Sequence, residues 1–194
     1  INSFKVSITA TVLSIAIGTP LAYLFTIFKI KGKSVLNILI VVASMSAPFI
    51  GAYSWILLLG RSGVITAFFK NLGIAIPDIY GFGGIVLVMT LQLFPLVFLY
   101  AKGALKNIDN SLIEAAENLG CSGIVCFFKV VVPLIMPTLL AAALLVFMRS
   151  FADFGTPMLI GEGYMVLTVL VYNEYMSEIG GNAHLASALS VVVG

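Results

Sequence analysis

Chemically reactive side chains are few in this chain of 194 residues. Cys121 and Cys126 are the two cysteines, and His184 is the single histidine, far from them in the sequence. A zinc site needs about four such ligands close together, and nucleophilic catalysis needs a base beside its nucleophile. The sequence therefore predicts no catalytic residue and no metal site, and it disfavours an enzyme.

Three other side chains could line a path through an apolar environment. Gln92 and Pro95 lie inside one apolar stretch, and Asp153 lies at the end of another. A carboxylate close to hydrocarbon is costly unless a pathway or a partner needs it, so Asp153 is a candidate for a translocation path. Gln92 and Pro95 are candidates for the same path. The alternatives are a solvated helix end with Asp153 paired to Arg149, and an interhelical hydrogen bond and a kink at Gln92 and Pro95.

The most polar stretch, residues 102–129, contains a short amphipathic helix. Ser111 and Glu114 have the spacing of a capping box, which predicts a helix that starts at Leu112 and ends at Gly120. One face of this helix is apolar and built mainly of small residues: Leu112, Ala115, Ala116 and Leu119. Such a face suits close approach to a groove on a partner.

Composition places these residues in a membrane protein. The chain is 61% hydrophobic and 9% charged, with a mean hydropathy of +1.15, which excludes an ordinary soluble domain. The net charge of +2 gives no broad basic face, so a nucleic-acid partner is not expected.

Apolar stretches predict an all-α polytopic membrane helix bundle. Four are expected to cross the ~30 Å of hydrocarbon: residues 4–28, residues 35–59 with a kink near Pro48, residues 85–100, and residues 124–148 with the span itself from near Val130. A fifth span begins near Ala183 and is cut by the chain end, so we expect a fragment of a longer polypeptide. Residues 60–81 predict a folded-back loop with a short interfacial helix, and residues 149–182 an irregular or re-entrant outer segment.

Lysines predict the orientation of the spans. Alternating spans put six lysines on one side: Lys29, Lys31, Lys33, Lys102, Lys106 and Lys129. The other side has four basic residues: Lys5, Arg61, Lys70 and Arg149. Because cytoplasmic loops carry the excess of basic residues, we expect the N-terminus outside and residues 102–129 in the cytoplasm.

The polar stretch also carries a longer pattern. Glu114-Ala115-Ala116 is followed after three residues by Gly120 and after nine more by Val130-Val131-Val132-Pro133. This resembles the EAA loop of type-1 importer permeases of binding-protein-dependent ABC transporters, in which EAA, three residues, Gly and nine residues precede Ile-x-Leu-Pro. Valines replace the Ile and the Leu here, while the spacing holds throughout.

The resemblance implies a single permease domain over residues 1–194, with a type-1 importer core, in the inner (cytoplasmic) membrane. In that family the loop is a coupling helix seated in a cleft of a cytoplasmic ATPase. Carried onto this chain, the coupling residues are Glu114, Ala115, Ala116, Glu117, Leu119, Gly120, Val130, Val132 and Pro133. The chain has no Gly-rich phosphate-binding motif, so ATP and Mg would be bound by an ATPase dimer, and no cofactor is expected in this chain.

The resemblance also implies further partners and a substrate. The expected partners are an extracytoplasmic substrate-binding protein, a second permease domain in the same or a separate chain, and membrane lipid. The stretches 150–157 and 161–164 resemble the ferric-iron uptake branch, while polyamine, phosphonate, thiamine and oxyanion permeases share much of the architecture. The rival class is a secondary transporter or channel without an ATPase. Such proteins place ionisable groups in mid-membrane, whereas Gln92 is the most polar side chain deep in these spans.

Overall fold

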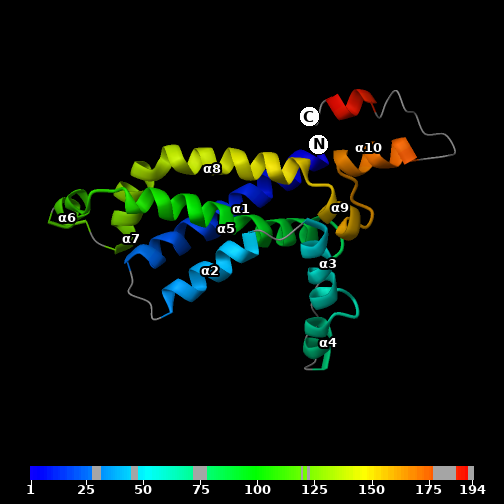
Figure 1. Ribbon diagram of the computed structural model, residues 1–194, viewed down its shortest axis with the longest axis horizontal. Helices are drawn as coiled ribbons and strands as arrows, with labels where there is room; N and C mark the ends of the chain where they lie inside the picture. Colours follow the sequence, from blue (N-terminus) through cyan, green and yellow to red (C-terminus); the bar gives the residue numbers. More distant parts are fainter. Residues whose placement is uncertain are drawn as a thin grey trace. The chain divides into compact units, whose positions relative to one another are not determined.

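The computed structural model describes residues 1–27, 32–44, 48–71, 78–118, 120–121, 123–176 and 187–191. Every regular element that it describes is a helix, which confirms the all-α fold class (Figure 1). The helices are α1 (Asn2–Ile27), α2 (Lys33–Ser44), α3 (Pro48–Leu59), α4 (Val64–Asn71), α5 (Phe82–Lys106), α6 (Asn110–Asn118), α7 (Gly123–Cys126), the π-helix η1 (Phe127–Val131), α8 (Val132–Ala152), α9 (Gly155–Ile160) and α10 (Leu167–Met176).

Four of the described stretches are long and apolar enough to cross a membrane: Asn2–Ile27, Phe49–Asn71, Phe82–Lys106 and Phe127–Ala152. Three of them coincide with the spans predicted at residues 4–28, 85–100 and 124–148. Helix α5 extends six residues beyond the predicted end of its span, as far as Lys106. It also passes through Pro95 without ending.

The single span predicted over residues 35–59 stays a prediction. This stretch is described as α2 and α3, with residues 45–47 outside the described part. Pro48 is the first residue of α3, a position where its missing N–H leaves no hydrogen bond unmade. The described stretch that is long enough to cross a membrane in this region, Phe49–Asn71, continues from α3 through a turn into α4. Helix α4 is the short helix that was predicted within residues 60–81.

Contacts divide the chain into two compact units. One comprises Ile1–Thr11, Met45–Gln92 and Phe147–Gly194, and the other Val12–Ser44 and Leu93–Val146, which we call the first and second unit. The single permease domain with four full spans and the start of a fifth stays a prediction. His184 and the predicted start of the fifth span near Ala183 lie outside the described residues, although residues 187–191 are helical.

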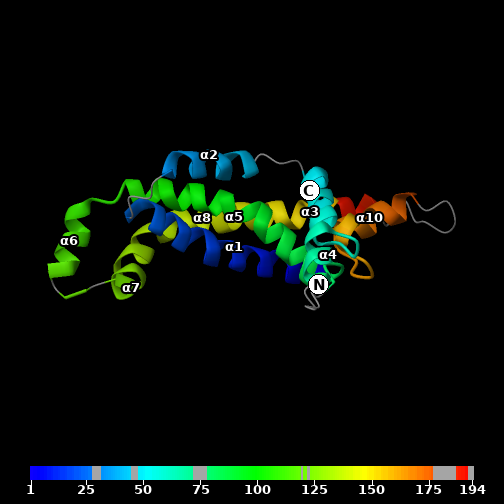
Figure 2. The ribbon, with the colours of Figure 1, turned by 90° about the horizontal axis from the view of Figure 1, so that it is seen from below.

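The core of the second unit lies between α1, α5 and α8, which run side by side in Figures 1 and 2. Phe25 and Phe98 meet edge to face with ring centroids 5.2 Å apart. A Cβ added at Gly18 would lie 2.9 Å from the Cβ of Val97, so α1 and α5 approach more closely than a larger residue would permit. Small residues at such contacts are typical of helices that associate in lipid.

In the first unit, α9 packs against α3 (Figure 1). The ring of Phe154, just before α9, lies 5.9 Å from that of Phe49 and 5.1 Å from that of Tyr172, centroid to centroid. The segment 149–182, predicted to be irregular or re-entrant, is mostly helical where it is described, with α9 and α10 separated by residues 161–166. Re-entry into the membrane stays a prediction.

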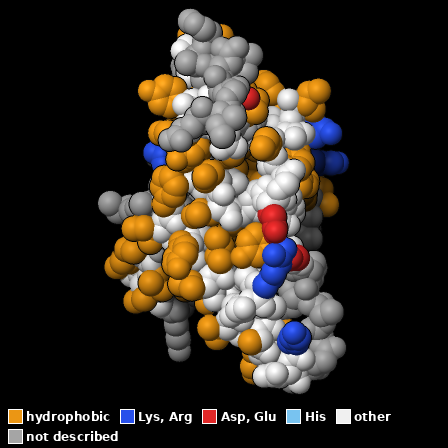
Figure 3. Space-filling view, turned by 90° about the vertical axis from the view of Figure 1, so that its right-hand side faces the viewer, with side chains coloured by type: hydrophobic (Ala, Val, Ile, Leu, Met, Phe, Trp, Pro, Cys, Tyr) orange, Lys and Arg blue, Asp and Glu red, His pale blue; other side chains and the backbone are white. Residues whose placement is uncertain are grey.

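The start of α1 fixes the beginning of α10 within the same unit. The Asn2 side chain donates to the Met165 carbonyl at 3.0 Å, and the Leu167 N–H donates to the Ser3 hydroxyl at 2.7 Å. Many large apolar side chains of the candidate spans remain exposed, and Figure 3 shows apolar side chains widely spread over one face. Such a surface fits contact with lipid.

Candidate functional site

Helix α6 begins two residues earlier than predicted. It starts at Asn110, and the Asp109 carboxylate accepts a hydrogen bond from the Ser111 N–H at 3.0 Å. Asp109 is exposed, and this backbone hydrogen bond holds the pKa of its carboxyl below the ordinary value of 3.8. The sequence favoured Ser111 as the capping residue, whereas the structure gives that role to Asp109, because a carboxylate caps a helix N-terminus as well as a hydroxyl does.

The predicted end of α6 is confirmed. Gly120 has φ of +83°, and the Cys121 N–H donates to the Ala116 carbonyl at 3.0 Å. A positive φ followed by this longer hydrogen bond is the Schellman closure of a helix, which glycine adopts without steric strain. Both ends of α6 are thus fixed by local hydrogen bonds.

The small-residue face of α6 is open. Leu112 exposes 50% of its surface, Ala115 is exposed and Ala116 is half-buried. A leucine this exposed, beside two alanines on a helix of nine residues, leaves an apolar strip uncovered by the described residues. The side chains of Glu114 and Glu117, and the whole of Leu119, lie outside the described part.

The Val-Val-Val-Pro segment forms the junction between the loop and α8. Pro133 is the second residue of α8 and has no N–H to donate to the Lys129 carbonyl, and an α-helical turn there would bring its ring against that carbonyl. The preceding turn widens into η1, where the Val132 N–H bonds to the Phe127 carbonyl. Val131 is fully buried, while Val130 and Val132 are half-buried and Pro133 is exposed.

Gln92 and Pro95 lie one turn apart on α5. Pro95 is fully buried, and the buried side-chain nitrogen of Gln92 has no hydrogen-bond partner among the described residues. The interhelical hydrogen bond considered for Gln92 is therefore not made to any described residue, and a buried amide without a partner is costly.

Asp153 follows the last residue of α8 and is half-buried. Its carboxylate accepts from the Gly155 N–H at 3.0 Å, and burial raises the pKa of this carboxyl despite that bond. The pairing of Asp153 with Arg149 is not formed: both residues are described, and no ion pair joins them. A helix end in contact with solvent stays an alternative. Asp153 borders a small space in the first unit that is also lined by three serines, Ser3, Ser7 and Ser150, whereas Gln92 does not line it.

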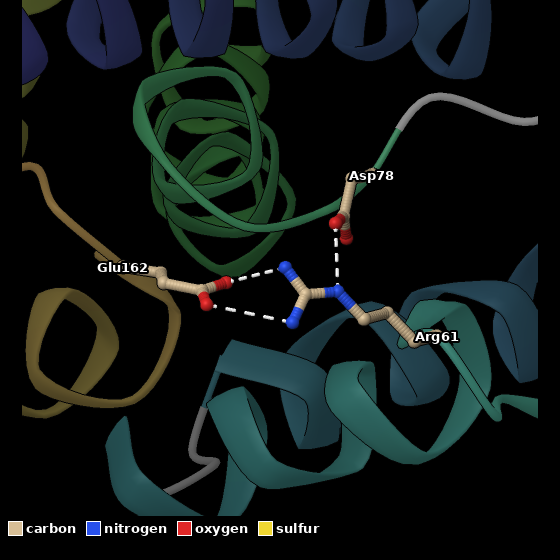
Figure 4. A network of polar contacts seen from close by, with 3 residues as sticks. All are labelled: Arg61, Asp78 and Glu162. Carbon is tan, nitrogen blue, oxygen red and sulfur yellow. Dashed lines mark hydrogen bonds and ion pairs between the residues drawn. The ribbon is translucent and has the colours of Figure 1, made fainter.

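One polar network in the first unit was not predicted from the sequence. Figure 4 shows the Arg61 guanidinium between two carboxylates, with Nε 2.9 Å from Asp78 Oδ2 and Nη2 2.7 Å from Glu162 Oε2. The guanidinium carbon also lies 4.7 Å from the centre of the Tyr80 ring. Asp78 and Glu162 are 17 and 101 positions from Arg61 in the sequence, so no local spacing reveals this network.

Comparison with known proteins identifies the family. A family model described as "Binding-protein-dependent transport system inner membrane component" matches residues 14–194. The chain is 30% identical over 174 residues to the ferric transport system permease protein FbpB of Actinobacillus pleuropneumoniae, covering 88% of this chain and 25% of that protein. It is 31% identical over 195 residues to the spermidine/putrescine transport system permease protein PotB of Haemophilus influenzae, covering 98% of this chain and 67% of that protein.

The name of a further relative includes a third substrate. The chain is 31% identical over 156 residues to the molybdenum transport system permease protein ModB of Haemophilus influenzae, covering 79% of this chain and 66% of that protein. The chain spans about a quarter to a third of the length of the ferric permeases that it matches. Because the family model covers nearly all of its residues, the chain belongs to the inner membrane components of binding-protein-dependent transport systems, the permeases of ABC importers.

Proposed function

We propose that this chain forms the membrane pathway of an ATP-driven importer and that α6 is its coupling helix. The observation that carries the proposal is the uncovered strip of Leu112 and Ala115 on a short helix whose two ends are fixed by Asp109 and Gly120. A short, rigid helix with a small-residue face fits a groove on a partner. The proposed partner is a cytoplasmic ATPase dimer, which would bind ATP and Mg.

The connections of α6 support a mechanical role. The helix stands in the loop between α5 and α8, two candidate spans, and it contacts α7 and η1 on the way to α8. Movement of an ATPase groove would displace α6 as a rigid body and transmit the displacement to the spans through the half-buried valines beside Pro133. Alternating access to the two membrane faces would follow, with substrate delivered by an extracytoplasmic binding protein and a second permease domain completing the pathway.

The coupling role is tested by a matched pair of substitutions in the full-length permease. Ala115→Trp places bulk on the uncovered strip of α6, and Asn118→Trp places the same bulk on another face of the same exposed helix. We expect Ala115→Trp to reduce co-purification of the ATPase and ATP-dependent uptake at least tenfold, because one buried clash costs over about 1.4 kcal/mol. Asn118→Trp should change either value less than twofold.

Two outcomes would contradict the proposal. Equal losses in both variants, with normal membrane insertion, would show that the strip is not the contact. Uptake by the wild-type chain without any ATPase would instead favour a secondary transporter or channel.

Protease protection of the loop in sealed vesicles tests the proposed orientation, in which residues 102–129 face the cytoplasm and the N-terminus lies outside.

Ferric iron is the proposed substrate. The support is the ferric transport named for FbpB and the resemblance of the segments around Asp153 and Glu162 to the ferric branch. Spermidine or putrescine and molybdenum are named for other relatives of similar identity, and phosphonate and thiamine remain candidates. Uptake of radioactive ferric iron into cells with and without the gene, in competition with spermidine and molybdate, distinguishes these substrates.

Gln92, Pro95 and Asp153 are the proposed translocation residues. Gln92 offers a buried amide nitrogen without a described partner, which a substrate or a helix of the second permease domain would satisfy. Gln92→Leu should therefore lower uptake while leaving ATPase co-purification unchanged. Equal uptake by Gln92→Leu and wild type would assign Gln92 to packing alone.

A further inference from the structure

Lys102 on α5 is held in place within the second unit. Its ammonium group donates a hydrogen bond to Asn37 Oδ1 on α2 and lies 5.5 Å from the centre of the Phe98 ring. Among the described residues, these contacts use one of the three N–H donors of the ammonium group, so two remain available. The side chain is half-buried, which fixes the position of the charge without removing it from contact with a ligand.

Two further lysines lie one helical turn away on the same two helices, Lys33 from Asn37 and Lys106 from Lys102. Lys33, the first residue of α2, and Lys106, the last residue of α5, both act electrostatically on Lys102. The ion pairs among the described residues all belong to Arg61, so none of the three lysines has a described carboxylate within 4.0 Å. Three positive charges on α2 and α5, with no counter-charge among the described side chains, favour an anionic ligand.

The surface beside the lysines is apolar. None of the residues of α2 is buried, and five large apolar side chains on this helix are exposed: Val35, Leu36, Ile38, Leu39 and Val42. Figures 1 and 2 both show α2 on the outer side of α1 and α5 in this unit. An apolar helix surface that ends at a cluster of lysines matches a molecule with acyl chains and an anionic headgroup.

We propose that Lys33, Lys102 and Lys106, with Asn37, form a binding site for the phosphate headgroup of an anionic phospholipid. The phosphate accepts hydrogen bonds from the free donors of Lys102 and from the Asn37 amide, while Lys33 and Lys106 neutralise its charge. The acyl chains lie along the exposed face of α2. The site does not depend on the coupling role of α6 or on the orientation of the chain.

Native mass spectrometry of the delipidated full-length permease tests the site, with phosphatidylglycerol and phosphatidylcholine as probes. We expect tighter binding of phosphatidylglycerol, and a loss of about fivefold in its affinity for each of Lys33→Gln, Lys102→Gln and Lys106→Gln. Lys70→Gln, which removes an equal charge from α4 in the other unit, is the control and should leave the affinity unchanged. Glycerol phosphate, which has the headgroup chemistry without acyl chains, should not displace the lipid.

The proposal is overturned if both lipids bind equally, or if the triple glutamine variant keeps its preference for phosphatidylglycerol. It is also overturned if the lysine variants weaken binding of the ATPase in detergent and leave lipid binding unchanged, because the cluster would then face a protein. The thermal midpoint of each variant in phosphatidylcholine should match that of the wild type. A loss of phosphatidylglycerol binding can then be assigned to the site and not to unfolding of the variant.

Discussion

Arg61 Nη2 lies 2.7 Å from Glu162 Oε2, across 101 residues of sequence. The same guanidinium uses its Nε for Asp78, so one side chain joins the turn after α3, the residues before α5 and the turn after α9 (Figure 4). The Gly81 N–H, which donates to the Ile160 carbonyl at 2.8 Å, ties two of these segments together beside the network. The first unit therefore has a polar cross-link between three loops.

We predict that Arg61→Gln loosens these loops with little effect on global stability. All three side chains are exposed, and ion pairs in water contribute little because solvent screens them. Hydrogen exchange of residues 78–82 and 161–164 should become faster by a few-fold, while the thermal midpoint changes little. High salt should speed exchange in the wild type toward the rate of the variant.

Arg61→Lys is the matched control for the geometry of this network. It keeps the charge but cannot bind one carboxylate with two nitrogens while a third nitrogen bonds another. We expect exchange close to that of Arg61→Gln. Wild-type exchange in Arg61→Lys would show that charge alone holds the loops.

We predict that α6 weakens in acid because of Asp109. The pKa of this carboxyl is lower in the folded protein than its ordinary value of 3.8, so its stabilising effect is complete above 3.8 and is lost as pH falls through the lower folded value. The protection of residues 110–118 against hydrogen exchange, measured relative to the intrinsic exchange rate at each pH, should fall only in that range. Asp109→Asn keeps a capping oxygen without a titrating group and should abolish the acid dependence. An unchanged acid response in this variant would contradict capping by Asp109.

Two glycines with open space around them allow a test of the closure of α6. Gly120 and Gly103 both have no heavy atom within 4 Å of an added Cβ, but Gly120 has φ of +83° while Gly103 lies inside α5. Gly120→Ala should destabilise the closure by about 1–2 kcal/mol, because alanine is strained at that φ. Gly103→Ala should be neutral or stabilising by up to about 1 kcal/mol. Thermal unfolding and ATPase co-purification measure both, and equal behaviour of the two would argue against the Schellman closure.

The sequence predicted those features of the structure that depend on residues close together in the chain. The spans at α1, α5 and α8 follow from apolar length, and Gly120 follows from the preference of helix ends for positive φ. The start of α6 was misplaced because Asp109, Asn110 and Ser111 are all good capping residues, and sequence spacing favoured the wrong one.

The features that the sequence did not predict depend on tertiary contacts. Helix α5 continues past residue 100, the predicted end of its span: Ala101 and Leu105 pack in the core of the second unit, and the Lys102 ammonium contacts Asn37 and the Phe98 ring. The bonds of Arg61 to Asp78 and Glu162 have no signature in sequence spacing.

Asp153 is predicted to lower the stability of the protein at neutral pH. Burial raises the pKa of its carboxyl above 3.8, so the folded protein holds the proton to a higher pH than the unfolded chain does. The free energy of unfolding therefore falls as pH rises from 3.8 through the raised folded pKa, and it stays lower above that value. This sign is opposite to that of Asp109.

Asp153→Asn separates the charge from the hydrogen bond. The amide oxygen still accepts from the Gly155 N–H, but the buried charge is gone, so the thermal midpoint at neutral pH should rise by a few degrees, given ~2–4 °C per kcal/mol at this chain length. The fall in stability above pH 3.8 should disappear. Asp153→Ala, which loses both charge and acceptor, should lie below Asp153→Asn because the Gly155 N–H is left unpaired. If Asp153→Asn is instead destabilised at neutral pH as much as Asp153→Ala, the ionised carboxylate has a favourable partner, and a translocated cation or the second permease domain becomes the candidate for it.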